Sequence, residues 1–532
     1  MKSRYFIFLV LLLQLPVNVL AETYHDHLKQ HLLSRMENLP AEVIKHYRQS
    51  GFTYLWVRQG KLLPRAYGVV KLLQKAADKG LRSEDYPYPA IRLRWAATSP
   101  EALAELEVLL TQAFVAYSRH LANGRWLPSR VDPQWHITKP PLDAISLLAR
   151  LDGNNIELLM QDIEPVHAGY QALIEKLAEY RQIAAQGGWP VVGPGPILRA
   201  GRQHADVPRI RERLKATRDL ILGPVVQADN VDVVFMDAVM RFQARQGLAI
   251  DGIVGPQTRA AMDIPVEERI HKITINIDRW RWLPRRLGKR YLLINLTGFE
   301  LYAEEEDKTV MAMPIIIGKR YRSTPSFSSK VRYLEINPYW TIPKTIMLED
   351  LIPIQLRDEE YFNRKQIKAF LGWGQDAEEV DVEEIALRRL NENYFPYRFR
   401  QEPGPLNSLG QIKFMFPNPY DIYLHDTPDR HLFNLRIRTF SSGCIRVSDP
   451  LRLSAYLLDA PNQQKEEEVL RLIYRGENRS MSLVKAVPIY LLYWTAWTGL
   501  DGKLNFSEDI YHRDGLMLQD LAQGNPKYPV YQ

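Results

Sequence analysis

A Gly- and Pro-rich segment at residues 187–196 divides the sequence into two parts with different patterns. Seven of its ten residues are Gly or Pro, which favour neither the interior of a helix nor that of a strand. Before it, apolar residues recur at helical spacing; after it, and above all beyond residue 270, short β-rich runs alternate with turns. A chain of 532 residues also exceeds one ordinary domain. We therefore expect a multidomain α+β protein with a boundary at this segment.

The part between residues 22 and 196 is predicted to be a helical scaffold domain. Residues 67–79 place apolar side chains at helical spacing before Gly80, and Ser99 precedes a proline, as a cap precedes the first turn of a helix. Residues 158–185 add one or two further helices. The domain contains no acid, base or metal constellation that we would assign to chemistry.

A small unit of three helices is predicted at residues 197–265. Helical patterns cover residues 207–217 and 235–246, and a third short helix ends at Met262, after a turn that Asp251 and Gly252 shape. The unit resembles the peptidoglycan-binding domain 1 family in Ala238, Phe242, Gln243, Gly247-Leu248 and Asp251-Gly-Ile-Val-Gly255. This resemblance implies a groove for glycan or stem peptide. A structural spacer is the alternative.

Residues 270–480 are predicted to form a mostly β domain. Short β-rich runs support this at residues 291–296, 299–303, 311–317 and 331–336. Residues 345–400 interrupt them with a charged helical pattern, notably over 376–391, and inserts of this size often act as lids. A solvated decoration is the alternative. Residues 481–532 should add a strand at 487–497 and a tail that packs on the scaffold or the β domain.

The first 21 residues have the pattern of a Sec-type signal peptide. Lys2 and Arg4 precede an apolar run, and Val19-Leu-Ala21 offers a small-residue cleavage site. An uncleaved leader is the alternative, and it would be the chain's only attachment to a membrane. We expect export to the periplasm of a Gram-negative-like cell.

The charge of the chain is mildly basic. Lys and Arg exceed Asp and Glu by seven, 69 against 62, and by five once Lys2 and Arg4 of the leader are removed. Such a surface suits an anionic polymer such as the cell wall. No Lys/Arg cluster with interleaved aromatics occurs, so we expect no nucleic-acid partner.

Cys444 is the only cysteine of the chain, and its surroundings favour catalysis. It follows Ser441, Ser442 and Gly443 in a turn, nineteen residues after His425. A thiol needs a base or a cationic neighbour to act as a nucleophile, and His425 is the candidate base. The N–H groups of Gly443 and Cys444 could stabilise an oxyanion. A lone cysteine is more often a small buried apolar residue, but an exported protein risks oxidation by keeping an unpaired thiol.

These residues carry a resemblance to a known family. His425 and Ser-Ser-Gly-Cys444-Ile-Arg446 resemble the signature of YkuD-type L,D-transpeptidases, although Ser442 stands where most members have histidine. The large periplasmic YcbB-like branch shares that departure. The chain is similar to this branch over nearly the whole mature sequence, notably in Asn337-Pro-Tyr-Trp340, Gln401–Phe414 and His425-Asp-Thr-Pro428.

The resemblance implies that the chain forms 3-3 cross-links in peptidoglycan. Cys444 would form a thioester with a tetrapeptide stem with loss of D-Ala, and His425 would serve as base, with His431 the weaker alternative. Arg446 would bind a carboxylate or favour the thiolate, and a backbone carbonyl that the sequence does not locate would orient the histidine. Further implied substrate-binding residues are Asn337, Tyr339, Trp340, Tyr423, Ser441 and Ser442. Tyr339 and Trp340 could equally be core aromatics.

The same resemblance implies that carbapenems acylate the thiol, that no cofactor or metal is needed, and that residues 345–400 form a helical capping subdomain. Peptidoglycan stem peptides and glycan are the expected partners, and cell-wall synthases stay open. Two competing functions remain: an L,D-carboxypeptidase or endopeptidase that uses the same site, and a non-catalytic wall-binding protein.

Overall fold

The structure, a computed structural model, describes residues 17–34, 39–139, 141–151, 155–221, 228–306, 308–374, 376–459 and 463–524. The chain divides into two compact units: residues 1–125, 139–165 and 520–532 form one, and residues 126–138 and 166–519 form the other. The predicted leader lies outside the described residues up to position 16. Its expected cleavage site falls within helix α1 (Val17–Ser34).

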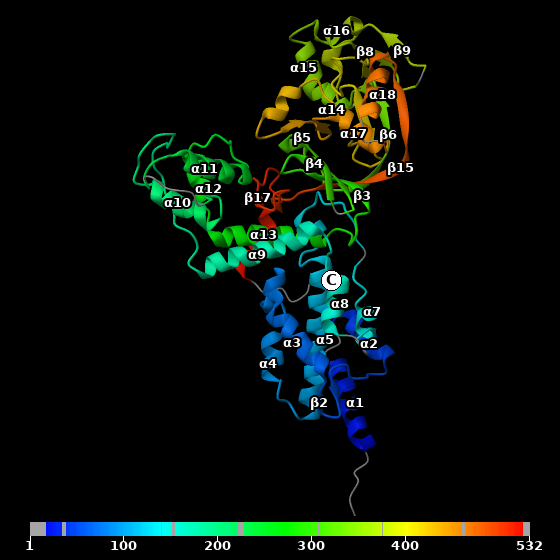
Figure 1. Cartoon of the computed structure of the whole chain (residues 1–532). Helices are drawn as coiled ribbons and strands as arrows, with labels where there is room; N and C mark the ends of the chain where they lie inside the picture. The colour runs from blue at the N-terminus through cyan, green and yellow to red at the C-terminus, as the bar shows by residue number, and fades with distance from the viewer. Residues whose placement is uncertain are drawn as a thin grey trace, which may run out of the picture. The chain divides into compact units, whose positions relative to one another are not determined.

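The first unit is a helical scaffold (blue to cyan in Figure 1). The helix expected at 67–79 appears as α3, continued by a 3-10 turn that ends at Gly80 in the left-handed conformation. The predicted Ser99 cap is confirmed, because its hydroxyl accepts the N–H of Ala102 at 3.3 Å. The helices of this unit are α1, α2 (Ala41–Gln49), α3 (Pro64–Gln74), α4 (Tyr88–Leu93), α5 (Pro100–Asn123), α7 (Ala144–Ala149) and α8 (Ile156–Ile163), and its strands are β1 (Val57–Arg58) and β2 (Lys61–Leu62).

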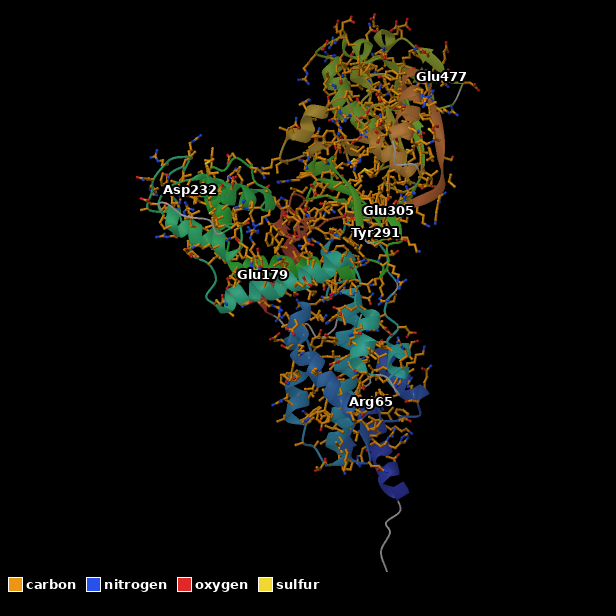
Figure 2. The ribbon with its side chains drawn as sticks, viewed as in Figure 1. Arg65, Glu179, Asp232, Tyr291, Glu305 and Glu477 are labelled. Atoms are coloured by element: carbon orange, nitrogen blue, oxygen red, sulfur yellow. The ribbon has the colours of Figure 1, made fainter. Side chains whose placement is uncertain are left out.

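The predicted small helical unit is present in the second unit as α10 (Val207–Ala216), α11 (Val233–Arg245) and α12 (Pro256–Met262). Asp232, labelled in Figure 2, caps α11 by accepting the N–H of Phe235 at 2.8 Å. The Gln243 side chain fixes the following loop: its amide donates to Asp251 Oδ1 at 2.8 Å and its carbonyl accepts from Gly252 at 2.9 Å. The expectation that Asp251 and Gly252 shape this loop is confirmed.

The prediction that strands begin at residue 270 is wrong. Residues Val266–Arg281 form helix α13, which packs along α9 (Ala168–Ala185). The last nine residues of α13 are all buried. A helix segment that is buried on all sides lacks the polar face by which a helix is recognised in a sequence. In α13 the isoleucines at 273, 275 and 277 also alternate with polar residues, which is the pattern of a strand.

Within the described residues, nine strands form the sheet of the β domain, in the order β13-β5-β14-β12-β11-β6-β15-β3-β4. Strand β4 also pairs with β5, so the sheet closes on itself around an apolar core. The four expected strands are confirmed as β3, β4, β5 and β6. The bounds are β3 (Arg290–Asn295), β4 (Glu300–Glu305), β5 (Lys308–Gly318), β6 (Ser328–Ile336), β11 (Ile412–Met415), β12 (Leu424–His425), β13 (Thr439–Ser441), β14 (Ile445–Val447) and β15 (Arg479–Leu492).

The insert is not the helical subdomain that we expected. Residues 376–391 form strand β9 (Glu378–Val380) and two 3-10 turns, Val382–Glu384 and Leu387–Arg389. Its charged residues are exposed on this strand and these turns rather than aligned along a helix face. The described part of this region contains a four-stranded sheet in the order β7-β10-β8-β9, whose further strands are β7 (Trp340–Thr341), β8 (Ile367–Leu371) and β10 (Tyr397–Gln401). Its short helices are α14 (Lys344–Ile346), a π-helix at Met347–Leu351, α15 (Ile352–Gln355) and α16 (Tyr361–Arg364).

The C-terminal segment contributes to the closed sheet. The strand predicted at 487–497 is instead β15, which begins at Arg479 and ends at Leu492. A bulge between Ser482 and Val487 separates two stretches of pairing with β6, so the alternation of its first half does not stand out in the sequence. The other elements of this region are α17 (Pro450–Leu457), α18 (Gln463–Tyr474), β16 (Ala496–Thr498), β17 (Leu504–Phe506) and α19 (Gly515–Gln523), which crosses the division between the units.

Candidate active site

The strand register places the predicted thiol and imidazole on neighbouring segments, because Cys444 directly precedes β14 and β14 pairs with β12, which ends at His425. Strands β12 and β14 are parallel, with Leu424 opposite Ile445 and His425 opposite Arg446. Leu424 and Ile445 are fully buried in the core. Because successive strand residues point to opposite faces, His425 and Arg446 lie on the face away from this core. Tyr423, one residue before Leu424, lies on that face as well.

The turn that carries Cys444 is held by its own serine. Ser441 Oγ donates to the carbonyl of Cys444 at 2.5 Å and accepts the N–H of Gly443 at 3.1 Å. Gly443 has φ 119°, a conformation that residues with a Cβ adopt at a cost. Among the described residues, nothing accepts the N–H of Cys444. The predicted pair of oxyanion donors is therefore corrected: the N–H of Gly443 is engaged within the turn, and that of Cys444 is available.

A second set of contacts braces this turn from the loop after β5. Thr324 Oγ1 donates to the carbonyl of Gly443 at 2.7 Å and accepts the N–H of Gly318 at 3.0 Å. The hydroxyl of Tyr511 donates to the carbonyl of Gly318 at 2.6 Å. The N–H and the carbonyl of Gly443 are thus both fixed, so the backbone directly before Cys444 is rigid.

Burial raises the pKa of the Cys444 thiol to about 11. Hydrogen bonds from the N–H and hydroxyl of Tyr423 to the sulfur oppose this rise, as does the charge of Lys413. The thiol itself lies 3.5 Å from the carbonyl oxygen of Asp421, to which it can donate. The resting group is therefore a neutral thiol, and Tyr423 beside it favours the thiolate.

His425 is oriented by a backbone carbonyl. Its Nδ1 lies 2.5 Å from the carbonyl oxygen of Asp426, an acceptor, so Nδ1 carries the proton and Nε2 keeps a lone pair. Burial, followed by the charge of Arg446, lowers the pKa of His425 to about 3. The Asp426 carboxylate points elsewhere: it accepts from Gln411 N–H and Arg430 Nη1, each at 3.0 Å. As expected, this side chain does not orient the histidine.

Two cations flank the imidazole. Arg446 pairs with Asp429 at 3.1 Å, and its buried Nε has no partner among the described residues. Lys413 lies opposite His425 across the β11–β12 pair, with its Nζ 4.3 Å from the ring centre of Tyr423 and 3.6 Å from Glu335 Oε2. A charged imidazole would be repelled by both, which favours the neutral ring.

Comparison with known families decides what this domain is. Residues 289–466 match the family of the L,D-transpeptidase catalytic domain, called YkuD. The chain carries an L,D-transpeptidase catalytic domain. Residues 203–262 match a "Putative peptidoglycan binding domain", and residues 41–177 match a family described as a scaffold domain.

Individual proteins resemble the chain less completely. A "Putative L,D-transpeptidase" of Haemophilus influenzae is 31% identical over 245 residues, which cover 46% of this chain and 48%, about half, of that relative's length. An L,D-transpeptidase structure from Xylanimonas cellulosilytica is 16% identical with a TM-score of 0.16, and covers 56% of this chain and 100% of its own. One from Stackebrandtia nassauensis is 12% identical with a TM-score of 0.22, and covers 56% and 94%.

Two of the predicted substrate-binding residues of the transpeptidase domain, Asn337 and Trp340, have structural roles instead. The Asn337 amide is used up at the end of α18, where it donates to the carbonyls of Leu472, Ile473 and Glu477 at 3.1–3.3 Å. Asn337 also has φ 47°, so it is a structural turn residue rather than an open amide. Trp340 is buried in the apolar cluster of the insert, as the core alternative predicts.

Tyr339, the neighbour of Trp340, is 40% exposed, and the guanidinium of Arg400 lies 4.3 Å from its ring centre. The hydroxyl of Ser442 accepts from Arg322 Nη1 at 2.8 Å. His431 lies in the exposed 3-10 turn Arg430–Asn434, away from the sheet position that His425 holds.

Sequence reasoning missed Lys413 and Arg322. Lys413 lies within a strand whose pairing with β12 could be drawn only once the register is known. Arg322 lies in the turn after β5, 120 residues before its partner Ser442, and no spacing in the sequence signals that contact.

The described residues contain no group of three or more His, Cys, Asp and Glu side chains arranged to hold a metal ion. Within the same residues, no helix combines the length and the apolar character that crossing a membrane requires.

Proposed function

We propose that this protein is a cell-wall L,D-transpeptidase that makes 3-3 cross-links through a thioester on Cys444. One observation carries the proposal. Within an L,D-transpeptidase catalytic domain, a lone cysteine lies in the turn directly before β14, and the neighbouring strand β12 ends at a buried histidine whose Nδ1 bonds a backbone carbonyl, which leaves a lone pair on Nε2. A base and a thiol on one rigid sheet meet the needs of covalent acyl transfer.

In the first half-reaction, Cys444 attacks the carbonyl between the L-centre of diaminopimelate and the terminal D-Ala of a tetrapeptide stem. The thiol proton passes to His425 as the S–C bond forms, because the resting thiol is neutral. The C–N bond then breaks, and His425 returns the proton to the departing amine of D-Ala. The products are free D-Ala and a thioester that conserves the energy of the cleaved amide.

In the second half-reaction, a side-chain amine of a neighbouring stem attacks the thioester carbonyl. The amine gives its proton to His425, the new C–N bond forms, and the C–S bond breaks. The leaving sulfur takes the proton back from His425, which restores the resting site. No cofactor or outside reactant enters this balance.

The tetrahedral intermediates of both halves carry negative charge on oxygen. The N–H of Cys444, which no described residue engages, is the donor that we assign to it. The sulfur of the departing thiolate is stabilised by the N–H and hydroxyl of Tyr423. Arg446 supplies the cation for a substrate carboxylate, and its buried Nε without a described partner supports this role.

The remaining parts of the chain fit action on the wall outside the cytoplasm. A peptidoglycan-binding domain at residues 203–262 would hold glycan or stem peptide near the catalytic domain. Residues 1–21 would direct export to the periplasm, and cell-wall synthases remain candidate partners. Carbapenems would acylate Cys444 as substrate mimics.

The test is product analysis with a disaccharide-tetrapeptide. Wild type should release D-Ala and form a cross-linked dimer, while Cys444→Ala should form neither. Tripeptide without dimer would replace the proposal with an L,D-carboxypeptidase. Wall binding that survives in Cys444→Ser, without turnover by wild type, would point to the wall-binding function.

A further inference from the structure

Arg322 contacts both the insert and the turn that carries Cys444. It ends the 3-10 turn Arg320–Arg322 that follows β5, and its side chain is only 12% exposed. The guanidinium makes two ion pairs, with Glu349 and with Asp350. Its Nη1 also donates to Ser442 Oγ at 2.8 Å.

These partners come from different elements. Glu349 and Asp350 lie on the π-helix Met347–Leu351 of the insert, a type of helix that is rare and often found at functional sites. Ser442 lies two residues before Cys444 in the nucleophile turn. Arg322 is thus a side-chain link between the insert and the turn that carries the thiol.

The link acts on Ser442, the residue directly before the braced Gly443. Ser441 and Thr324 fix the N–H and the carbonyl of Gly443, while the side chain of Ser442 is held by Arg322. The Ser442–Gly443 peptide ends at a glycine with φ 119°, a residue with unusual rotational freedom. A change in the position of Ser442 would therefore strain the contacts of Gly443 with Ser441 and Thr324, through which the N–H of Cys444 is oriented.

Only arginine can make this set of contacts. Its guanidinium presents five N–H donors in a rigid planar fork, which can serve two carboxylates and a hydroxyl at once. A lysine keeps the charge but offers a single flexible point, so it can pair with the carboxylates without holding Ser442 in one place.

We infer that Arg322 is a positioning residue that couples the insert to the nucleophile turn, and so aligns Cys444 when the insert occupies its place. The inference rests on the proposed role of Cys444 as the nucleophile. It assigns to the insert a direct mechanical connection to the thiol, in addition to any covering of the substrate. The substrate that binds under the insert would thereby help to assemble the oxyanion donor.

The first experiment compares Arg322→Lys, Arg322→Gln and the double variant Glu349→Gln/Asp350→Asn. All should lower kcat for cross-linking by roughly 10- to 100-fold with little change in KM, because a misplacement of about 1 Å can cost about 100-fold. Arg364→Gln is the matched control, since Arg364 forms an Arg–Asp pair with Asp358 on the exposed surface of the insert. It should keep wild-type kcat and KM.

A merely structural role for Arg322 predicts something different. It would lower the melting temperature of all Arg322 variants and leave the properties of the folded fraction unchanged. We expect instead a changed pH profile of Cys444 alkylation by iodoacetamide, measured per folded molecule. An unchanged profile and unchanged kcat in folded Arg322→Lys would overturn the inference. If Arg322→Gln does not fold, Arg322→Lys and Ser442→Ala decide.

The second experiment is a double-mutant cycle between the insert and the turn. Ser442→Ala and Glu349→Gln/Asp350→Asn should each lower kcat, and their combination should lower it no further than the larger single effect. Multiplicative effects would contradict coupling through Arg322. Cys444→Ala separates the two claims: if it still cross-links, the proposed function fails, and if it is inactive while the cycle is multiplicative, only the coupling fails.

Discussion

Glu107 of the scaffold, which is fully buried, and Cys444 of the transpeptidase domain, which is half-buried, both lose solvation but serve different roles. Burial raises both pKa values, to about 7 for Glu107 and to about 11 for Cys444. Glu107 is enclosed by donors: Tyr47 Oη at 2.9 Å, Trp56 N–H at 2.8 Å and the N–H of Leu55. These donors use the hydrogen-bonding capacity of the carboxylate. Because they come from a loop and from α2, Glu107 on α5 connects a loop and two helices.

The site of Cys444 is organised in the opposite way. Tyr423 and Lys413 favour the thiolate of Cys444, the neighbouring imidazole keeps a lone pair on Nε2, and the N–H of Cys444 meets no described acceptor. Free hydrogen-bonding capacity of this kind is costly unless a substrate uses it. The comparison indicates that a group whose hydrogen-bonding capacity is fully used has a structural role, and that a site with unused hydrogen-bonding capacity has a reactive one.

The largest effect should come from removing the reactive groups. Cys444→Ala should lower cross-linking by at least about 10⁴-fold, and His425→Ala by about 10²–10⁴-fold, with folding retained. The assay is D-Ala release per folded molecule. His431→Ala is the control and should keep full activity; inactivity of His431→Ala with an active His425→Ala would reverse the assignment.

Removing Glu107 should lower stability without changing the reactivity of the thiol. Glu107→Ala leaves the buried N–H groups of Leu55 and Trp56 unpaired and should destabilise the scaffold by about 3 kcal/mol, while thiol reactivity stays unchanged. Hydrogen exchange in α5 reports the loss locally. A variant with wild-type protection in α5 would show that the enclosure of Glu107 is not what stabilises this helix.

The pH dependence of scaffold stability should follow from Glu107 with a defined sign. The unfolded carboxyl titrates near 4.5 and the folded one at about 7. Between these values the folded state binds more protons, so stability falls as pH rises from 4.5 to 7 and then levels off, by on the order of 3 kcal/mol. Urea unfolding of the scaffold at several pH values measures it. Glu107→Gln should remove this slope, and a slope that persists in the variant must have another origin.

The smallest predicted effect sharpens the description of the thiol. Tyr423→Phe removes the hydroxyl donor to the sulfur and should raise the pKa of Cys444 further. Alkylation by iodoacetamide at neutral pH should slow by about tenfold, the value of one such hydrogen bond. The full pH profile is the readout, with Tyr339→Phe as control because Tyr339 packs against Arg400 instead. Equal rates in both variants would remove Tyr423 from the site.

The regions that the sequence predicted well are those where local pattern and tertiary environment agree. Strands β3 to β6 alternate or run apolar and are bounded by turns, so their positions followed from the residues. The cap at Ser99 and the Asp251-Gly252 loop are also local devices. Cys444 and His425 could be proposed as site residues from the sequence because both stand in a specific motif.

The errors have the converse origin. The last nine residues of helix α13 are all buried, which removes the helical alternation of apolar and polar residues. Residues 376–391 have a helical composition but form a short strand and two 3-10 turns. The oxyanion donors were misassigned at Gly443 because the bond from its N–H to Ser441 Oγ depends on turn geometry. Arg322 depends on contacts across 120 residues, which no local pattern carries.

The central claim is that substrate is held as a thioester on Cys444. The most direct measurement is the intact mass of the protein after brief incubation with a disaccharide-tetrapeptide, followed by peptide mapping. The account predicts an adduct of the substrate minus D-Ala, located on the peptide that contains Cys444 and absent from Cys444→Ala. Turnover by wild type without any adduct on that peptide, or an adduct that persists in Cys444→Ala, would contradict it.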